Sequence, residues 1–313
     1  MKNEATLYGL AFTAYGLILL VPAAIEDVLM RGLWRPFDIA SYYALAAPAS
    51  SLIYAIVDVA STSPMLLFNM GALSDHRIYI VSFFCIAAAM LVMDAGHRLY
   101  GAGAGLLAGL LFALNITGAQ GYLATGEALA LALTLLSAYV LLFNKKYLLS
   151  GLCLGTAACF KPLAILLAPA ALFFIYKRGE PRGAITFAGA ALLPLALMAI
   201  VAFAVYGGNT LTMAVDSGFT AVGFVAAESY RSPDALMAAA NVVLAVCLLS
   251  SLLPLALLGF SREYGLSQKY FLAAGLCFVA TIVLKQYLHY WVFALPFLAL
   301  LCIGAFGRRP SRE

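Results

Sequence analysis

Five charged side chains stand close together just after the first apolar segment of this chain: Glu26, Asp27, Arg31, Arg35 and Asp38. The chain as a whole is 65% hydrophobic and only 10% charged, so a cluster of this density is unusual in it. A carboxylate in such a cluster can act as a general base, and a guanidinium can bind a phosphate or carboxylate oxygen. We therefore expect catalytic chemistry in this stretch.

The composition predicts where this chemistry would take place. The chain has 313 residues and a mean hydropathy of +1.00, and long apolar runs recur from end to end. This pattern predicts an all-α, polytopic transmembrane helical bundle of about ten helices that forms a single domain over residues 1–313. Alternating apolar and polar residues are absent, which argues against a barrel. The net charge of +4 comes from short basic clusters between apolar runs, a pattern typical of cytoplasmic loops and not of a nucleic-acid partner.

A spanning helix requires about 20 mostly apolar residues. Charged or Gly/Pro-rich breaks divide the chain into ten such segments: 7–25, 78–94, 101–117, 121–143, 147–160, 162–176, 184–206, 235–260, 270–287 and 290–306. Residues 26–76 are expected to form a first outer loop that carries amphipathic helices on the membrane surface, and residues 207–234 a second outer loop.

The thirty residues of 147–176 contain Lys161-Pro162 in their middle and are flanked by a basic pair at each end. Pro162 lacks a backbone donor and disfavours helix at the residue before it. If both basic ends are cytoplasmic, the chain must go out and come back. We therefore predict two short helices with Lys161 at the turn between them, lining a wet cavity or buried in protein.

Ten crossings place both termini in the cytoplasm, with 12 of the 18 basic residues on that side. The other six are predicted at the non-cytoplasmic face: Arg31, Arg35, Arg77, Lys161, Arg231 and Lys285. Glu26, Asp27, Asp38 and Glu127 are predicted at the same face. Carboxylates and cations together at one face favour a polar site there over a simple anchor.

Five stretches carry a resemblance to a known family: Phe37-Asp38-Ile39-Ala40-Ser41-Tyr42-Tyr43 in the first outer loop, and then 97–105, 122–129, 150–162 and 288–297. In this order and spacing the chain resembles the GT-C superfamily of integral-membrane glycosyltransferases. That group includes dolichyl-phosphate-mannose-dependent mannosyltransferases and aminoarabinose transferases. The resemblance implies an inverting transfer of a sugar, with mannose favoured, from a polyprenyl phosphate to an acceptor on the non-cytoplasmic face.

The family pattern puts its catalytic carboxylate in the first outer loop, which makes Asp38 the candidate base, with Tyr42 one turn further on and Glu26 or Asp27 as rival bases. A plain alternative for Asp38 is a carboxylate that binds backbone donors at a helix N-terminus. No cofactor and no divalent metal are expected. The expected partners are membrane lipids, the lipid-linked sugar, an acceptor glycan, lipid or protein, and a partner subunit.

The lipid phosphate requires cations, because the departing oxygens carry negative charge. The candidates are Lys161, Arg231, Lys285 and His289, with Arg31 and Arg35 in support. Lys161 could instead form an internal ion pair with Glu127 or Asp38, and Lys285 could extend to the headgroups. Arg231 could be an ordinary interfacial arginine. Glu127 could bind a sugar hydroxyl or pair with a cation.

Two other functions fit the same sequence. A non-catalytic relative could serve as a scaffold subunit of a glycosylation complex. A lipid or solute transporter would show intramembrane charges in both leaflets and an internal inverted repeat, and neither is visible in the sequence.

Overall fold

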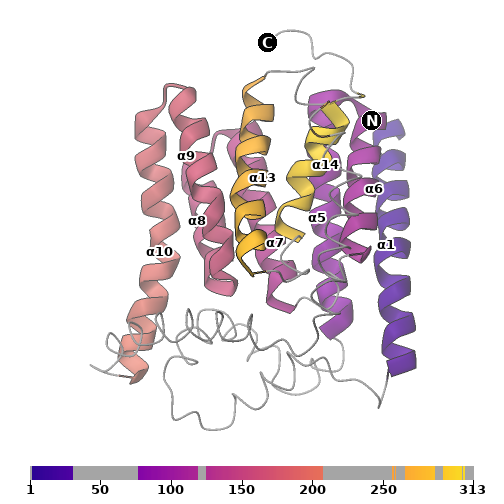
Figure 1. The fold of residues 1–313 in the computed structure, drawn as a ribbon, viewed down its shortest axis with the longest axis horizontal. Coiled ribbons are helices and arrows are strands. Elements are labelled where there is room, and N and C mark those ends of the chain that lie inside the picture. Colours follow the sequence, from indigo (N-terminus) through magenta and orange to yellow (C-terminus); the bar gives the residue numbers. More distant parts are fainter. Residues whose placement is uncertain are drawn as a thin grey trace.

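The architecture is all-helical in a computed structural model. The structure describes residues 2–30, 77–118, 125–206, 256, 258, 265–285, 292–304 and 306, and no strand occurs among them. Its helices stand side by side as a bundle, with α1 at one edge and α10 at the other (Figure 1). The helices are α1 (Lys2–Met30), α5 (Arg77–Tyr100), α6 (Ala102–Gly118), α7 (Thr125–Tyr139), α8 (Tyr147–Phe160), α9 (Leu167–Lys177), α10 (Pro181–Tyr206), α13 (Leu266–Lys285) and α14 (Leu295–Gly304). A π-helical turn, η3 (Val140–Asn144), extends α7, and a 3-10 turn, η4 (Pro162–Leu166), precedes α9.

Nine of the ten predicted apolar segments coincide with these helices. The tenth, 235–260, lies outside the described residues apart from Ala256 and Leu258. The largest difference in bounds is at α5, which continues past the predicted end at residue 94 to Tyr100. Helix continues there because Asp94 and Arg98 pair across one turn, so the charged residues that mark a loop in the sequence are accommodated in the helix.

Interhelical contacts bring the basic residues of different helices to one end of the bundle. Tyr8 near the start of α1 donates a hydrogen bond to Asp94 in the last turns of α5. The Gln268 amide near the start of α13 donates to the Tyr100 hydroxyl over 2.9 Å. We call this the basic end, which is uppermost in Figure 1, and the other the opposite end. Eight of the eleven lysines and arginines among the described residues lie at the basic end: Lys2, Arg98, Lys145, Lys146, Lys177, Arg178, Arg182 and Lys269.

The closest helix pair is α8 and α10, which run in the same direction because α9 lies between them in the chain and returns to the basic end. A Cβ on Gly151 would meet the Phe187 carbonyl oxygen, and one on Gly155 would meet the Ala191 carbonyl oxygen. Two small residues four apart thus allow the helix backbones to approach closely, as is typical of membrane helices. The constant offset of 36 residues between the two helices fixes their register.

The centre of the bundle is apolar and aromatic. All ten residues of α14 are buried, as expected of a helix that is hydrophobic on every side. Phe278 of α13 stacks on Phe293 and Phe297, with ring centroids 5.4 and 5.9 Å apart. Between α7 and α8, Ser137 and Ser150 each donate to the other's backbone carbonyl, at 2.8 and 2.9 Å. These bonds satisfy both buried hydroxyls within the protein.

The outer surface of the bundle is apolar as well. Ile185, Leu192 and Ile200 of α10 are 74%, 62% and 63% exposed. Two described helices contain a segment long and apolar enough to cross a membrane, Glu4–Pro22 in α1 and Ser82–Tyr100 in α5, while the other apolar segments found are 10–17 residues long. Length and composition alone are weak signs of a membrane, since core helices of water-soluble proteins also have them. An outward apolar face on an edge helix is a second sign, because water-soluble surfaces rarely expose large contiguous apolar patches.

The α8–α10 register predicts the effect of adding single methyl groups. Gly155→Ala should destabilise the bundle by about 1–3 kcal/mol, because the new Cβ overlaps the Ala191 carbonyl. The matched control is Gly189→Ala on α10, where a Cβ meets nothing within 4 Å and helix propensity should make the change neutral or stabilising by up to about 1 kcal/mol. Thermal unfolding in detergent measures both. Equal midpoints for the two variants would contradict the close packing of α8 on α10.

Candidate functional site

The break between α8 and η4 positions Lys161, one of the predicted phosphate ligands. The structure confirms the predicted separation of residues 147–176 into two helical segments at this residue. Lys161 is extended, with φ −146° and ψ 109°, as expected before a proline. Its N–H donates to the Ala157 carbonyl and its carbonyl accepts from the Ala164 N–H, both at 2.9 Å. Backbone hydrogen bonds within the turn therefore satisfy both the N–H and the carbonyl of Lys161. Its half-buried side chain is not needed to form the turn.

Lys161 is recessed within the bundle. If the 36-residue offset between α8 and α10 is continued past Gly155, Lys161 is level with Leu197, and α10 continues beyond that level to Tyr206. At 1.5 Å per residue, this leaves the lysine about 14 Å short of the end of α10. A cation at such a depth, surrounded by apolar helices, is costly unless an anion accompanies it.

Four further candidate positions lie on three helix ends at the end of the bundle toward which α8 runs. Glu26 and Asp27 are in the last turns of α1, Glu127 is in the first turn of α7, and Lys285 is the last residue of α13. Because α1 and α13 start at the basic end and α7 finishes there, all these positions fall toward the opposite end (Figure 1). The structure therefore brings these four backbone positions to the end where Lys161 is recessed. It describes the side chain of Lys161 alone among these candidates.

The other candidate residues lie outside the part of the chain that the structure describes. They are Asp38, Arg31, Arg35, Tyr42, Arg231 and His289.

A polar cluster that the sequence analysis did not single out lies at the basic end, around Asp94 of α5. Its carboxylate accepts hydrogen bonds from the hydroxyls of Tyr8 on α1 and Tyr139 on α7, and from Arg98 Nε at 2.8 Å. The Arg98 guanidinium also lies 5.3 Å from the centroid of the Tyr139 ring. Asp94 therefore ties three helices together. The one signal visible in the sequence was its four-residue spacing from Arg98.

Next to this cluster, hydrogen bonds and an ion pair join the turn between α7 and α8 to the turn between α9 and α10. Glu180 accepts a hydrogen bond from the Tyr147 hydroxyl and pairs with Lys145 Nζ at 3.6 Å. The Tyr147 bond and the nearby Lys145 cation hold the pKa of Glu180 below its usual range. Arg178 donates to the carbonyls of Leu141 and Leu142, both at 3.0 Å. A cation on these carbonyls satisfies acceptors that a helix C-terminus leaves open.

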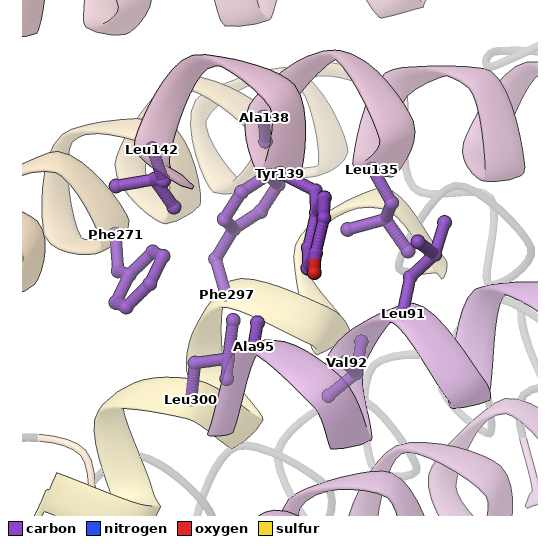
Figure 2. A pocket seen from close by; sticks show the side chains of 10 residues that line it. All are labelled: Leu91, Val92, Ala95, Leu135, Ala138, Tyr139, Leu142, Phe271, Phe297 and Leu300. Carbon is purple, nitrogen blue, oxygen red and sulfur yellow. The ribbon is translucent and has the colours of Figure 1, made fainter. Parts of the chain in front are cut away.

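A crevice between α5, α7, α13 and α14 has the wrong chemistry for a sugar or phosphate. Its volume is about 20 Å³, and it is lined by Leu91, Val92, Ala95, Leu135, Ala138, Tyr139, Leu142, Phe271, Phe297 and Leu300. Figure 2 shows the Tyr139 hydroxyl pointing toward α5, where it meets Asp94. A void of this size has room for about one water and offers it almost no polar partner. We regard it as a packing defect beside the Asp94 cluster.

No protein-family model, no curated protein and no solved structure matches the chain.

The Asp94 cluster predicts a coupled loss of stability. Asp94→Asn should lower the free energy of unfolding by about 1.5–3 kcal/mol, because it removes a charged acceptor shared by two tyrosines and an arginine. Tyr139→Phe should cost less, about 1 kcal/mol. The double variant should lose clearly less than the sum of the two, as expected for residues in direct contact. Denaturant unfolding of the four proteins measures the coupling, and strict additivity would contradict the Asp94–Tyr139 bond.

Proposed function

We propose that the chain is a multi-pass membrane glycosyltransferase of GT-C-like architecture, with about ten helices, that uses a polyprenyl-phosphate sugar. The observation that carries the proposal is Lys161: a cation at a helix break, recessed among apolar helices, toward the end of the bundle where the carboxylate-bearing helix ends also lie. A phosphate group is the kind of anion that such a lysine would bind.

The surface of the bundle supports a membrane location. The exposed apolar residues of α10 would contact lipid, and its 26 residues, about 39 Å, exceed the hydrocarbon thickness of about 30 Å. The basic end would be cytoplasmic under the positive-inside rule, and the start of α1 lies at this end. The opposite end, with the candidate residues, would then face the non-cytoplasmic side.

The depth of Lys161 favours a lipid-linked substrate. If α10 is centred in the bilayer, the lysine lies roughly 10 Å below the hydrocarbon boundary. A soluble anion would have to leave water to reach this level, whereas a polyprenyl phosphate is already anchored in the same layer by its tail. The ammonium would bind the phosphate of the donor and stabilise the negative charge that develops on it during transfer.

The reaction would be a single inverting displacement. Asp38 takes the proton from the acceptor hydroxyl, and the acceptor oxygen attacks the anomeric carbon of the sugar. The bond between that carbon and the phosphate oxygen breaks, and the electron pair leaves with the phosphate, next to Lys161. Glu26 and Asp27 are the rival bases. Arg231, Lys285 and His289 are further phosphate ligands in this proposal, with Arg31, Arg35 and Tyr42 in support, while Glu127 contacts a sugar hydroxyl or a cation.

A lipid or solute transporter is the second candidate, favoured by the same break at Lys161-Pro162. Transporters of several folds bind their substrate where a helix is interrupted within the membrane. The two functions differ in their product, because a transporter moves the substrate unchanged.

Transfer of a labelled sugar from a polyprenyl phosphate, measured with the purified protein in detergent, tests the enzyme. Lys161→Gln should reduce kcat/KM about 10²–10³-fold, because one phosphate ligand is lost. Asp38→Asn should lower kcat about 10²–10⁴-fold with donor binding retained. Lys269→Gln at the basic end removes the same charge and should leave the activity unchanged.

The outcomes separate the alternatives. Equal transfer by Asp38→Asn and the wild type would remove Asp38 as the base. Binding of the donor without turnover by the wild type would favour the scaffold. Movement of the intact labelled lipid between leaflets of reconstituted vesicles, without transfer, would favour the transporter.

A further inference from the structure

The basic end carries an uneven charge distribution around the two interlocked turns. Residues 145–147 and 178–182 lie side by side, joined by Lys145–Glu180 and Tyr147–Glu180. Glu180 is the acidic residue of these turns, and it is already engaged by Lys145 and Tyr147. Arg178 is engaged by the carbonyls at the end of α7. Cationic charge is therefore left over on the remaining basic residues.

Three basic residues supply this remaining charge: Lys146, Lys177 and Arg182. All three are exposed, and in the part of the chain that the structure describes none of them forms an ion pair. They come from three different helix ends, the starts of α8 and α10 and the end of α9. The Lys177 ammonium lies 5.7 Å from the centroid of the Phe173 ring, so it is held close to its own helix.

An exposed apolar residue lies within one helical turn of each cation, on the side away from the basic end. Leu148 follows Lys146 and is 59% exposed, and Ile185 follows Arg182 and is 74% exposed. Tyr176 and Phe173 precede Lys177 and are 71% and 40% exposed. The cations at the end of the bundle correspond in height to the phosphate groups of a phospholipid, and the apolar side chains next to them correspond to its acyl chains.

We propose that Lys146, Lys177 and Arg182, with Leu148, Tyr176 and Ile185 beneath them, form a docking surface for anionic phospholipid headgroups. Charge complementarity identifies the partner, because the surface has unpaired cations above an apolar layer and no free carboxylate among its described residues. The proposal depends on the membrane location within the proposed function and does not depend on sugar transfer.

The function of this surface would be to fix the α8–α9–α10 unit at the membrane boundary. The three cations sit at the ends of the two helices that flank the break and of the helix that packs on it. Lipid bound there would fix the start of α8 at the membrane boundary. Because Lys161 follows the last residue of α8, this would also fix how deep Lys161 lies in the membrane.

Lipid enrichment around the reconstituted protein tests the proposal. The full chain is placed in nanodiscs of phosphatidylcholine with about one fifth phosphatidylglycerol, extracted in mild detergent, and the lipid that stays bound is quantified. Wild type should retain phosphatidylglycerol at least fivefold above its share in the nanodisc. Lys146→Gln/Arg182→Gln should lose at least fivefold of this enrichment, since each basic residue near a membrane surface contributes about a fivefold factor.

The matched control is Lys2→Gln/Lys269→Gln, which removes two positive charges from the basic end away from the two turns. It should keep most of the enrichment. Equal loss of phosphatidylglycerol enrichment in both double variants would show that the whole basic end attracts the lipid, and it would overturn a localised surface. A wild type without enrichment would overturn the proposal as well. Failure of the chain to enter nanodiscs would instead contradict the membrane location. Sugar transfer, assayed in parallel in phosphatidylcholine alone, reports on the enzyme separately.

Discussion

The described structure depends on one local constraint, the missing N–H of Pro162 and the extended conformation that the proline forces on Lys161. At this dipeptide α8 ends after 14 residues, and the chain returns through η4 and α9. The return brings Lys177 back to the level of Lys145, and α10 can then run parallel to α8 and pack on its glycines. The register of the closest helix pair, the meeting of the two turns and the depth of the lysine all follow from this reversal.

Much of this arrangement could be predicted from the sequence because its signals are local. A proline after a lysine within an apolar run, with basic pairs at both ends, is sufficient to predict the reversal. The Asp94 cluster could not be predicted in the same way, because Tyr8 and Tyr139 are 86 and 45 residues away from Asp94. The sequence also could not separate the buried α14 from α10, since both are apolar throughout and only packing decides which of them faces outward. For the candidate site, residue types and helix ends were predictable, while the role of Asp38 rests on the family resemblance alone.

The two ends of the bundle handle charge differently. At the basic end, Asp94 is bound by two tyrosine hydroxyls and Arg98, and Glu180 by one tyrosine hydroxyl and Lys145. The Arg178 guanidinium donates to two backbone carbonyls. These contacts are complete within the chain and join neighbouring helices, so they account for the stability and orientation of that end. A substrate is not required to explain any of them.

Lys161 differs because the turn it occupies does not need it. Its backbone donor and acceptor are both satisfied by neighbours in sequence, so a small apolar residue before Pro162 would form the same turn. A cation at that depth is costly unless an anion accompanies it. The position of this lysine is therefore explained by an anion beside it. That anion is either a carboxylate of the chain or a ligand, and the helix ends bearing Glu26, Asp27 and Glu127 lie at the same end of the bundle as Lys161. An enzyme that uses carboxylates to accept a proton and a lysine to hold a phosphate would need both in the same place.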